Sequence, residues 1–217
     1  MPDLSFEILS ATPARDMLTP AISFDLRVTN RFPEQPIHAV LLRCQLQIDV
    51  ARRRYSATEQ SQLHDLFDNP GRWNDTLRAM TWANLSVNVP AFRTATSYSL
   101  VLPCNLDWDA AFAKYFHGLD GGDVPLSFLF SGSVLYDGGQ GALQIEPISW
   151  NKEARFRMPA EVWKRLMELH YPNSVALNLR RDLFDELYRL KTRLGLSTFE
   201  QAIEHMLRAA EREQPIS

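Results

Sequence analysis

The longest regular pattern in the sequence is an alternation of apolar and polar residues between positions 40 and 50. Six apolar side chains fall on one side of an extended chain: Val40, Leu42, Cys44, Leu46, Ile48 and Val50. The intervening residues are mostly polar: Arg43, Gln45, Gln47 and Asp49. A period of two indicates a β-strand with one dry face and one wet face, which is more typical of an antiparallel sheet than of a buried parallel one.

Shorter runs repeat this alternation and predict further strands. They lie at residues 22–28, 85–89, 98–102, 126–134 and 143–145. The sequence Tyr-Asp-Gly-Gly at 136–139 is typical of a hairpin turn, since glycine adopts positive φ at little cost. Six or more such strands predict an antiparallel β-sandwich over residues 1–155.

Two helical segments interrupt the predicted strands. One is expected at residues 58–67, where Leu63, Leu66 and Phe67 have helical spacing. The other is expected to follow Asp107, whose side chain suits an N-cap, and to present four apolar residues on one side. These residues are Ala111, Phe112, Tyr115 and Phe116.

The sequence of residues 156–217 predicts a mostly helical C-terminal region with one short strand. Pro159 suits the first turn of a helix, and an alternating strand is expected at 175–180. Asp182 is expected to cap the next helix, which would run from Leu183 to about Leu194 and end at Gly195.

The last predicted helix opens with a capping box formed by Ser197 and Glu200. The fold class is therefore α+β, with a sandwich followed by a helix–strand–helix–helix tail. This order of elements is that of a ribbon-helix-helix module.

Composition favours an ordinary globular protein without a strongly basic surface. The chain has 217 residues, of which 45% are hydrophobic and 23% charged, and its net charge is -3. That balance argues against wholesale disorder and lowers the prospect of nucleic-acid binding. The first residues lack the features of a signal peptide, and no run approaches the length of a membrane span, so we expect a cytoplasmic location.

Cys44 and Cys104 are interpreted as buried thiols, with a disulfide as the open alternative.

The sequence carries no recognisable catalytic, metal or cofactor motif. Its five histidines are dispersed, and the carboxylates of Asp120 and Asp123 fit a turn better than acid–base chemistry. We therefore expect a protein that is not an enzyme and that holds neither a metal nor a cofactor.

A cluster of arginine and aromatic residues is the first candidate for binding a protein partner. It comprises Arg53, Arg54, Tyr55, Arg72, Trp73 and Arg78. These residue types dominate interface hot spots, but solvated charge at strand and loop ends is the simpler alternative.

The predicted tail strand is the second candidate. In a ribbon-helix-helix dimer, Leu177 and Leu179 would face the core, and Asn178 and Arg180 would face the bases of DNA. Acidic residues follow closely at Asp182, Asp185 and Glu186 and would lie unfavourably near phosphates. Dimerisation, or packing against the protein's own body, is therefore the preferred use of this segment.

Several short motifs together resemble domain-of-unknown-function family 6084, a bacterial group. They begin at Leu42 (LRCQL), Arg53 (RRY), Leu63 (LHDLF), Arg72 (RW), Pro125 (PLSFLFSG), Trp150 (WNKEA) and Tyr171 (YPNS). The resemblance extends over nearly the whole chain. It implies an accessory, assembly or structural role beside the subunits of an oxygen-insensitive [NiFe]-hydrogenase, and it supplies no catalytic residues.

Overall fold

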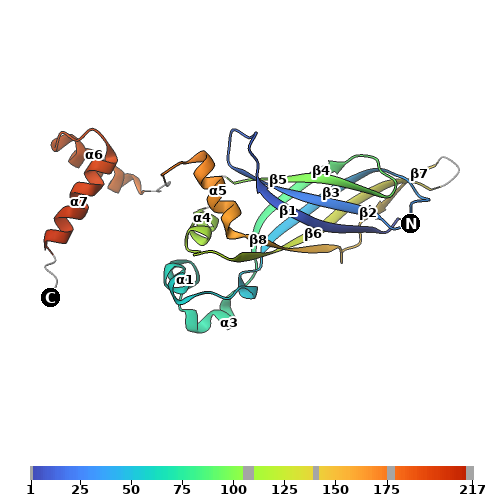
Figure 1. Cartoon of the computed structure of the whole chain (residues 1–217), viewed down its shortest axis with the longest axis horizontal. Coiled ribbons are helices and arrows are strands. Elements are labelled where there is room, and N and C mark those ends of the chain that lie inside the picture. The colour runs from blue at the N-terminus through green and yellow to red at the C-terminus, as the bar shows by residue number, and fades with distance from the viewer. Residues whose placement is uncertain (1, 105–109, 139–141, 175–178, 214–217) are drawn as a thin grey trace. The chain divides into compact units, whose positions relative to one another are not determined.

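The computed structural model describes residues 2–104, 110–138, 142–174 and 179–213 (Figure 1). Contacts divide the chain into two compact units, Met1–Ser174 and Val175–Ser217. The first unit extends beyond the expected boundary at 155/156, which lies inside strand β8 (Glu153–Pro159). Helix α5 (Ala160–His170) belongs with the strands because it packs against β1, β2 and β8.

The first unit contains two antiparallel sheets. The smaller has the order β1–β2–β5, with β1 at Leu4–Pro13, β2 at Ala21–Asn30 and β5 at Ala95–Pro103. The larger runs from β4 (Met80–Val89) through β3 (Ile37–Ile48) to β6 (Asp123–Asp137). The 15-residue β6 pairs on its other edge with β8 and then with β7 (Leu143–Pro147).

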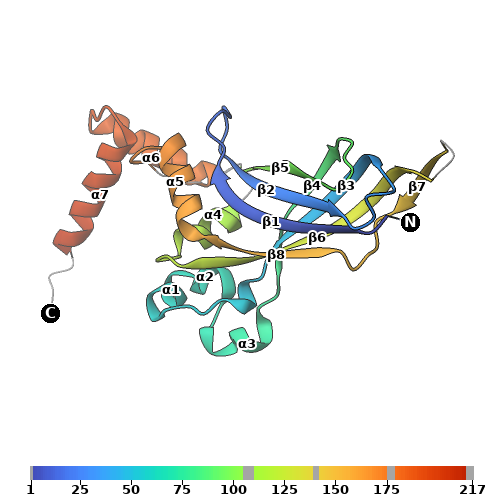
Figure 2. The ribbon, with the colours of Figure 1, turned by 45° about the vertical axis from the view of Figure 1, so that its right-hand side comes forward.

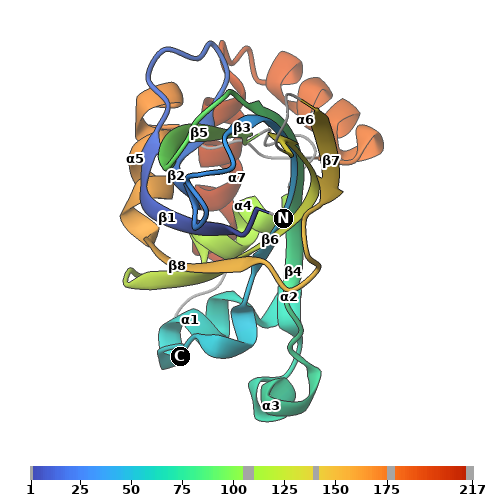
Figure 3. The same cartoon turned by 90° about the vertical axis from the view of Figure 1, so that its right-hand side faces the viewer.

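The two sheets face each other, as the end-on view shows (Figure 3), and share one apolar core. Alternate residues of β2 and β3 are fully buried, and aromatic pairs join the sheets: Phe6 stacks on Phe130 at 4.4 Å and Phe24 meets Phe128 at 5.1 Å between ring centroids. Burial of each large apolar side chain is worth about 1.5–3 kcal/mol. The α+β class is confirmed, and every strand expected before residue 150 is present; the strand expected at 175–180 falls mostly outside the described residues.

One glycine is required by the close approach of β6 to β3. Gly132 has φ of 128°, and a Cβ atom there would overlap the carbonyl oxygen of Leu41. Because only glycine adopts this conformation without strain, Gly132 allows the long strand to keep its pairing on both edges.

Helices close one end of the first unit. α4 (Ala110–His117) and α5 face each other through Phe116 and Trp163, whose rings stack at 4.5 Å, and Trp82 of β4 joins them. The side chain of Asp107, the expected cap of α4, lies outside the described residues. Cys44 and Cys104 are both buried and are not joined to each other by a disulfide.

The segment between β3 and β4 is an insertion of short helical turns, which we call the β3–β4 insertion (residues 49–79). It contains 3₁₀ turns at Val50–Arg52 and Pro70–Arg72, and helices α1 (Ala57–Gln62), α2 (His64–Phe67) and α3 (Trp73–Thr76). The single helix expected at 58–67 is thus two helices, broken at Leu63, which turns inward and is fully buried. The insertion leaves the larger sheet at the end that carries α4 (Figure 2).

The second unit contains helices α6 (Arg181–Arg193) and α7 (Phe199–Glu213). Gly195 has φ of 67° and ends α6 as expected, because the amide groups of Gly195 and Leu196 bond to carbonyls of the last turn. The expected N-caps were wrong by one or two residues. Arg180 occupies the N-cap of α6, which places Asp182 in the first turn. Thr198 and Gln201, rather than Ser197 and Glu200, exchange the capping bonds of α7.

Candidate partner-binding surface

All six arginine and aromatic residues of the first candidate cluster lie on the β3–β4 insertion, but the structure gives them different roles. The side chain of Arg53 is only 7% exposed, Trp73 is buried and Tyr55 is half-buried. Arg54, Arg72 and Arg78 are exposed. The cluster therefore divides into an inner set that supports the insertion and an outer set of three arginines that faces solvent.

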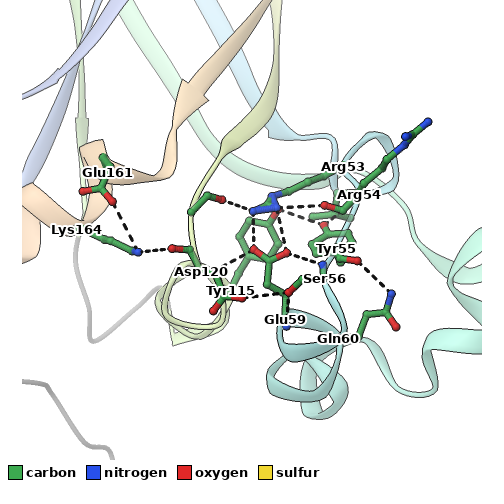
Figure 4. Close-up of polar contacts among 12 residues, drawn as sticks. Arg53, Arg54, Tyr55, Ser56, Glu59, Gln60, Tyr115, Asp120, Glu161 and Lys164 are labelled. Atoms are coloured by element: carbon green, nitrogen blue, oxygen red, sulfur yellow. Dashed lines mark hydrogen bonds and ion pairs between the residues drawn. The ribbon is translucent and has the colours of Figure 1, made fainter.

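The inner set is organised around a buried ion pair between Arg53 and Glu59 (Figure 4). Nη2 of Arg53 lies 2.7 Å from Oε1 of Glu59, whose side chain is 4% exposed, and it also donates to the carbonyl of Gly121. The second terminal nitrogen of Arg53, Nη1, donates to the carbonyl of Arg54 and to Oε2 of Glu59. The guanidinium thus joins the insertion to the loop that precedes β6.

Glu59 accepts two backbone hydrogen bonds in addition to the ion pair. One comes from the amide of Ser56 at 2.9 Å and completes a capping box at the start of α1. The other comes from the amide of Asp120 at 3.1 Å. The Glu59 carboxylate is thus compensated by a cation and two N–H donors, and the pair orders this part of the chain. Among the described residues, Nε of Arg53 has no hydrogen-bond partner although it is buried.

Aromatic rings support the same segment from inside. Tyr55 meets Trp73 edge to face at 5.2 Å, and its hydroxyl donates to the carbonyl of Val50. The indole N–H of Trp73 donates to the carbonyl of Asp68. Burial raises the pKa of the phenols of Tyr55 and Tyr115, so both stay protonated as hydrogen-bond donors.

Two of the outer arginines, Arg54 and Arg78, each border a surface hollow. One, of about 690 Å³, is lined by Arg52, Arg54 and Arg157 together with the 120–123 loop. The other, of about 550 Å³, is lined by α2 and by Thr76, Leu77 and Arg78. The side chain of Arg54 points away from the inner network toward solvent (Figure 4). These features make the insertion a firm, arginine-bearing surface.

Asp68, beside the second hollow, has an unusual backbone. Its φ of 60° and ψ of -156° fall in a region used almost solely by glycine, at a cost of about 1–3 kcal/mol. The conformation turns the chain between α2 and the turn at Pro70, and it directs the Asp68 carbonyl to Trp73. Trp73 therefore has a structural explanation that needs no binding partner.

Sequence reasoning did not include Glu59 or the 120–123 loop in this surface. The capping box Ser56-x-x-Glu59 was visible as a local signal. The pairing of Arg53 with Gly121 was not, because it joins residues 68 positions apart. The 120–123 segment bends the chain into β6, and Gly122 supplies its positive φ of 74°.

The second candidate, the tail strand, is described only in part. Leu177 and Asn178 lie outside the described residues. Leu179 and Arg180 precede α6 in a non-regular conformation, and Arg180 lies 3.4 Å from Asp182 with its side chain 81% exposed. Strand pairing by this segment stays a prediction.

Comparison of the sequence with family models identifies the family of the chain. A model described as Family of unknown function (DUF6084) matches residues 1–215. The chain belongs to DUF6084. No curated protein matches it. Membership of DUF6084 confirms the resemblance found in the sequence, and this family description names no activity.

Metal-binding side chains and membrane-spanning helices were the two remaining features to look for in this DUF6084 chain. Within the described ranges, no group of three or more His, Cys, Asp or Glu side chains is placed to hold a metal ion. In the same part of the chain, each helix is too short or too polar to cross a bilayer.

Proposed function

We propose that the protein is a non-catalytic accessory protein that binds a protein partner through its β3–β4 insertion. The observation that supports this is the exposure of Arg54, Arg72 and Arg78 on a segment held by a buried ion pair. Arginine is one of the residues most enriched among interface hot spots. A surface that is already ordered loses less entropy on binding, so its contacts contribute more to affinity.

The partner we propose is a subunit of a [NiFe]-hydrogenase, either during assembly or in the mature complex. This identification rests on the family resemblance and not on the geometry of the insertion. The three arginines predict that the complementary surface of the partner is acidic. A cytoplasmic location follows from the same proposal.

Affinity purification of the full chain from its native host tests both parts. The proposal expects hydrogenase subunits to be recovered with the protein, and expects Arg54→Ala/Arg72→Ala/Arg78→Ala to lose them. The matched control changes two exposed arginines of the sheets and one of the β4–β5 connection, Arg27→Ala/Arg43→Ala/Arg93→Ala, and should retain the subunits.

Two results would count against the proposal. Recovery of no hydrogenase subunit from cells that express the protein well would refute the partner. Equal recovery by both triple variants, each shown to be folded by circular dichroism, would refute the insertion as the binding surface.

The alternative proposal is a ribbon-helix-helix regulator that uses residues 175–180 to bind DNA. The arrangement of α6, a glycine turn and α7 directly after Arg180 favours it. Asn178→Ala and Arg180→Ala should then each abolish specific DNA retention, and the affinity should fall steeply with salt. Pairing of residues 175–180 with the first unit of the same chain would exclude this use.

A further inference from the structure

Helices α6 and α7 leave much of their apolar surface uncovered within the second unit. Among its described residues, Leu187 and Ala202 are the buried apolar side chains. Phe184, Tyr188 and Phe199 form a small aromatic cluster where the two helices meet. Seven large apolar side chains are 36–59% exposed: Leu183, Phe184, Tyr188, Leu194, Ile203, Met206 and Leu207.

A pair of helices with this much exposed apolar surface is not stable by itself. Amphipathic helices gain most of their stability from burying their apolar stripe, and short isolated helices are marginal in water. We therefore expect the exposed apolar faces of α6 and α7 to pack against another surface.

The spacing of the leucines on α6 indicates what kind of surface this is. Leu183, Leu187, Leu190 and Leu194 follow one another at intervals of four, three and four residues. These intervals are those of a coiled-coil seam, in which a second helix runs alongside. The outer two, Leu183 and Leu194, are 42% and 40% exposed, whereas Leu190 is half-buried and Leu187 is already buried within its own chain, so the outer leucines supply most of the free apolar surface of this seam.

The charges on α6 indicate the direction of that second helix. Apart from Arg181, its first half carries acidic residues and its second half basic ones. The acidic residues are Asp182, Asp185 and Glu186, and the basic residues are Arg189, Lys191 and Arg193. This division suits the dipole of the single helix. It also makes α6 complementary to an identical helix that runs antiparallel to it, because each acidic half then meets a basic half.

We propose that α6 pairs antiparallel with α6 of a second copy of this chain, forming a symmetric dimer. If Leu187 lies opposite Leu190 of the second copy, Leu183 lies opposite Leu194, because both intervals are four residues. In that register Glu186 and Arg193 flank the seam on the same side. Glu186 of each copy then meets Arg193 of the other, and the two-fold axis gives two such pairs.

The dimer stands apart from the proposed partner binding, since it uses residues of the second unit only. Its first test is the mass of the full chain in solution by light scattering or sedimentation velocity. The expected mass is twice 24.9 kDa, falling toward 24.9 kDa on dilution. Leu183→Glu/Leu194→Glu should yield a monomer. The matched control, Leu18→Glu/Leu143→Glu, changes two exposed leucines of the first unit and should leave the dimer intact.

Charge reversal tests the direction and register. Glu186→Arg alone, or Arg193→Glu alone, creates two like-charge contacts and should raise the dimer dissociation constant about tenfold or more. Combining both changes in one chain should restore the dimer. Mixing the two single variants should also restore it as a heterodimer, because the arginine introduced at position 186 of one chain then meets the glutamate introduced at position 193 of the other. No parallel pairing predicts that rescue.

Three outcomes overturn the proposal. A wild-type chain that stays monomeric at high concentration means that the leucines pack within one chain or await a different partner. A dimer that survives Leu183→Glu/Leu194→Glu forms through another surface. A dimer broken by the leucine changes but indifferent to the charge reversals pairs α6 in another register or direction. Circular dichroism of each variant confirms that the helices are retained.

Discussion

Removing Arg53 should leave the carboxylate of Glu59 buried without its cation. The two side chains are 7% and 4% exposed and their closest atoms lie 2.7 Å apart. Breaking a buried pair by removing one partner costs about 3–5 kcal/mol. Glu59 keeps its two backbone donors, from Ser56 and Asp120, so we expect a loss near the lower limit, about 3 kcal/mol, for Arg53→Met.

The assay is equilibrium unfolding in urea, with the free energy of unfolding extrapolated to water. Glu59→Gln should destabilise by a similar amount because it leaves the guanidinium unpaired. The double variant removes both charges and should cost less than the sum of the single variants by about 2 kcal/mol. Arg155→Met is the matched control, since Arg155 pairs with Glu153 at 3.0 Å but is 59% exposed, and it should cost under about 1 kcal/mol.

The reasoning would be refuted by a loss below about 1 kcal/mol for Arg53→Met, which is the range of exposed pairs. Strict additivity of the two changes would refute it equally, because it would mean that the charges do not interact. Either result would also weaken the view that this pair holds the insertion in place.

Three further predictions concern the first unit. Burial raises the pKa of the Cys44 thiol to about 12, so iodoacetamide at pH 8 should label Cys44 in unfolded protein but not in native protein, as measured by peptide mass. The hydrogen bond from Lys152 lowers the pKa of Asp3, so their pair should stabilise the fold above about pH 4 and lose its effect as the pH falls through the lowered value. Urea unfolding should show that Asp3→Asn costs about 0.5–1 kcal/mol at pH 7 and less at pH 3. Gly132→Ala should destabilise by more than about 2 kcal/mol in the same assay, because its Cβ would overlap Leu41.

Each of these has a clear contrary result. Rapid native labelling of Cys44 would mean that β3 opens readily. An equal effect of Asp3→Asn at both pH values would mean that its charge is not what matters. A neutral Gly132→Ala would show that β6 can move away from β3.

The strands were predictable where alternation was regular. β2 and β3 follow their apolar period closely, since one face of each meets the core and the other meets solvent. β8 was not assigned, although Ala154, Phe156 and Met158 alternate with charged residues, because the segment is short and precedes a helix. Its pairing with β6 depends on a partner about 30 residues earlier, which local periodicity does not reveal.

The sequence could predict which segment carries the candidate surface, but not which of its side chains are buried and which face solvent. Arginine and tryptophan are enriched both in interfaces and in buried networks, so residue type alone could not separate Arg53 and Trp73 from Arg54 and Arg72. Arg53 is distinguished by a carboxylate six residues away and a carbonyl 68 residues away, and Trp73 by the carbonyl of Asp68 and by its packing in the core. Those contacts depend on tertiary structure.

The long strand β6 also determines the order in which the first unit can be completed. Its outer edge is covered by β8, and β1 in turn lies against β8, so the first strand of the chain meets one of the last. Lys152 and Asp3, 149 residues apart, bond to each other at this junction. During synthesis β1 therefore lacks this neighbour until residue 159 has left the ribosome. Contacts of such sequence separation slow folding and leave strand edges exposed to other chains. A chain cut before β8 would leave residues 123–129 of β6 with an unprotected edge, and we expect it to aggregate instead of folding into a smaller sandwich.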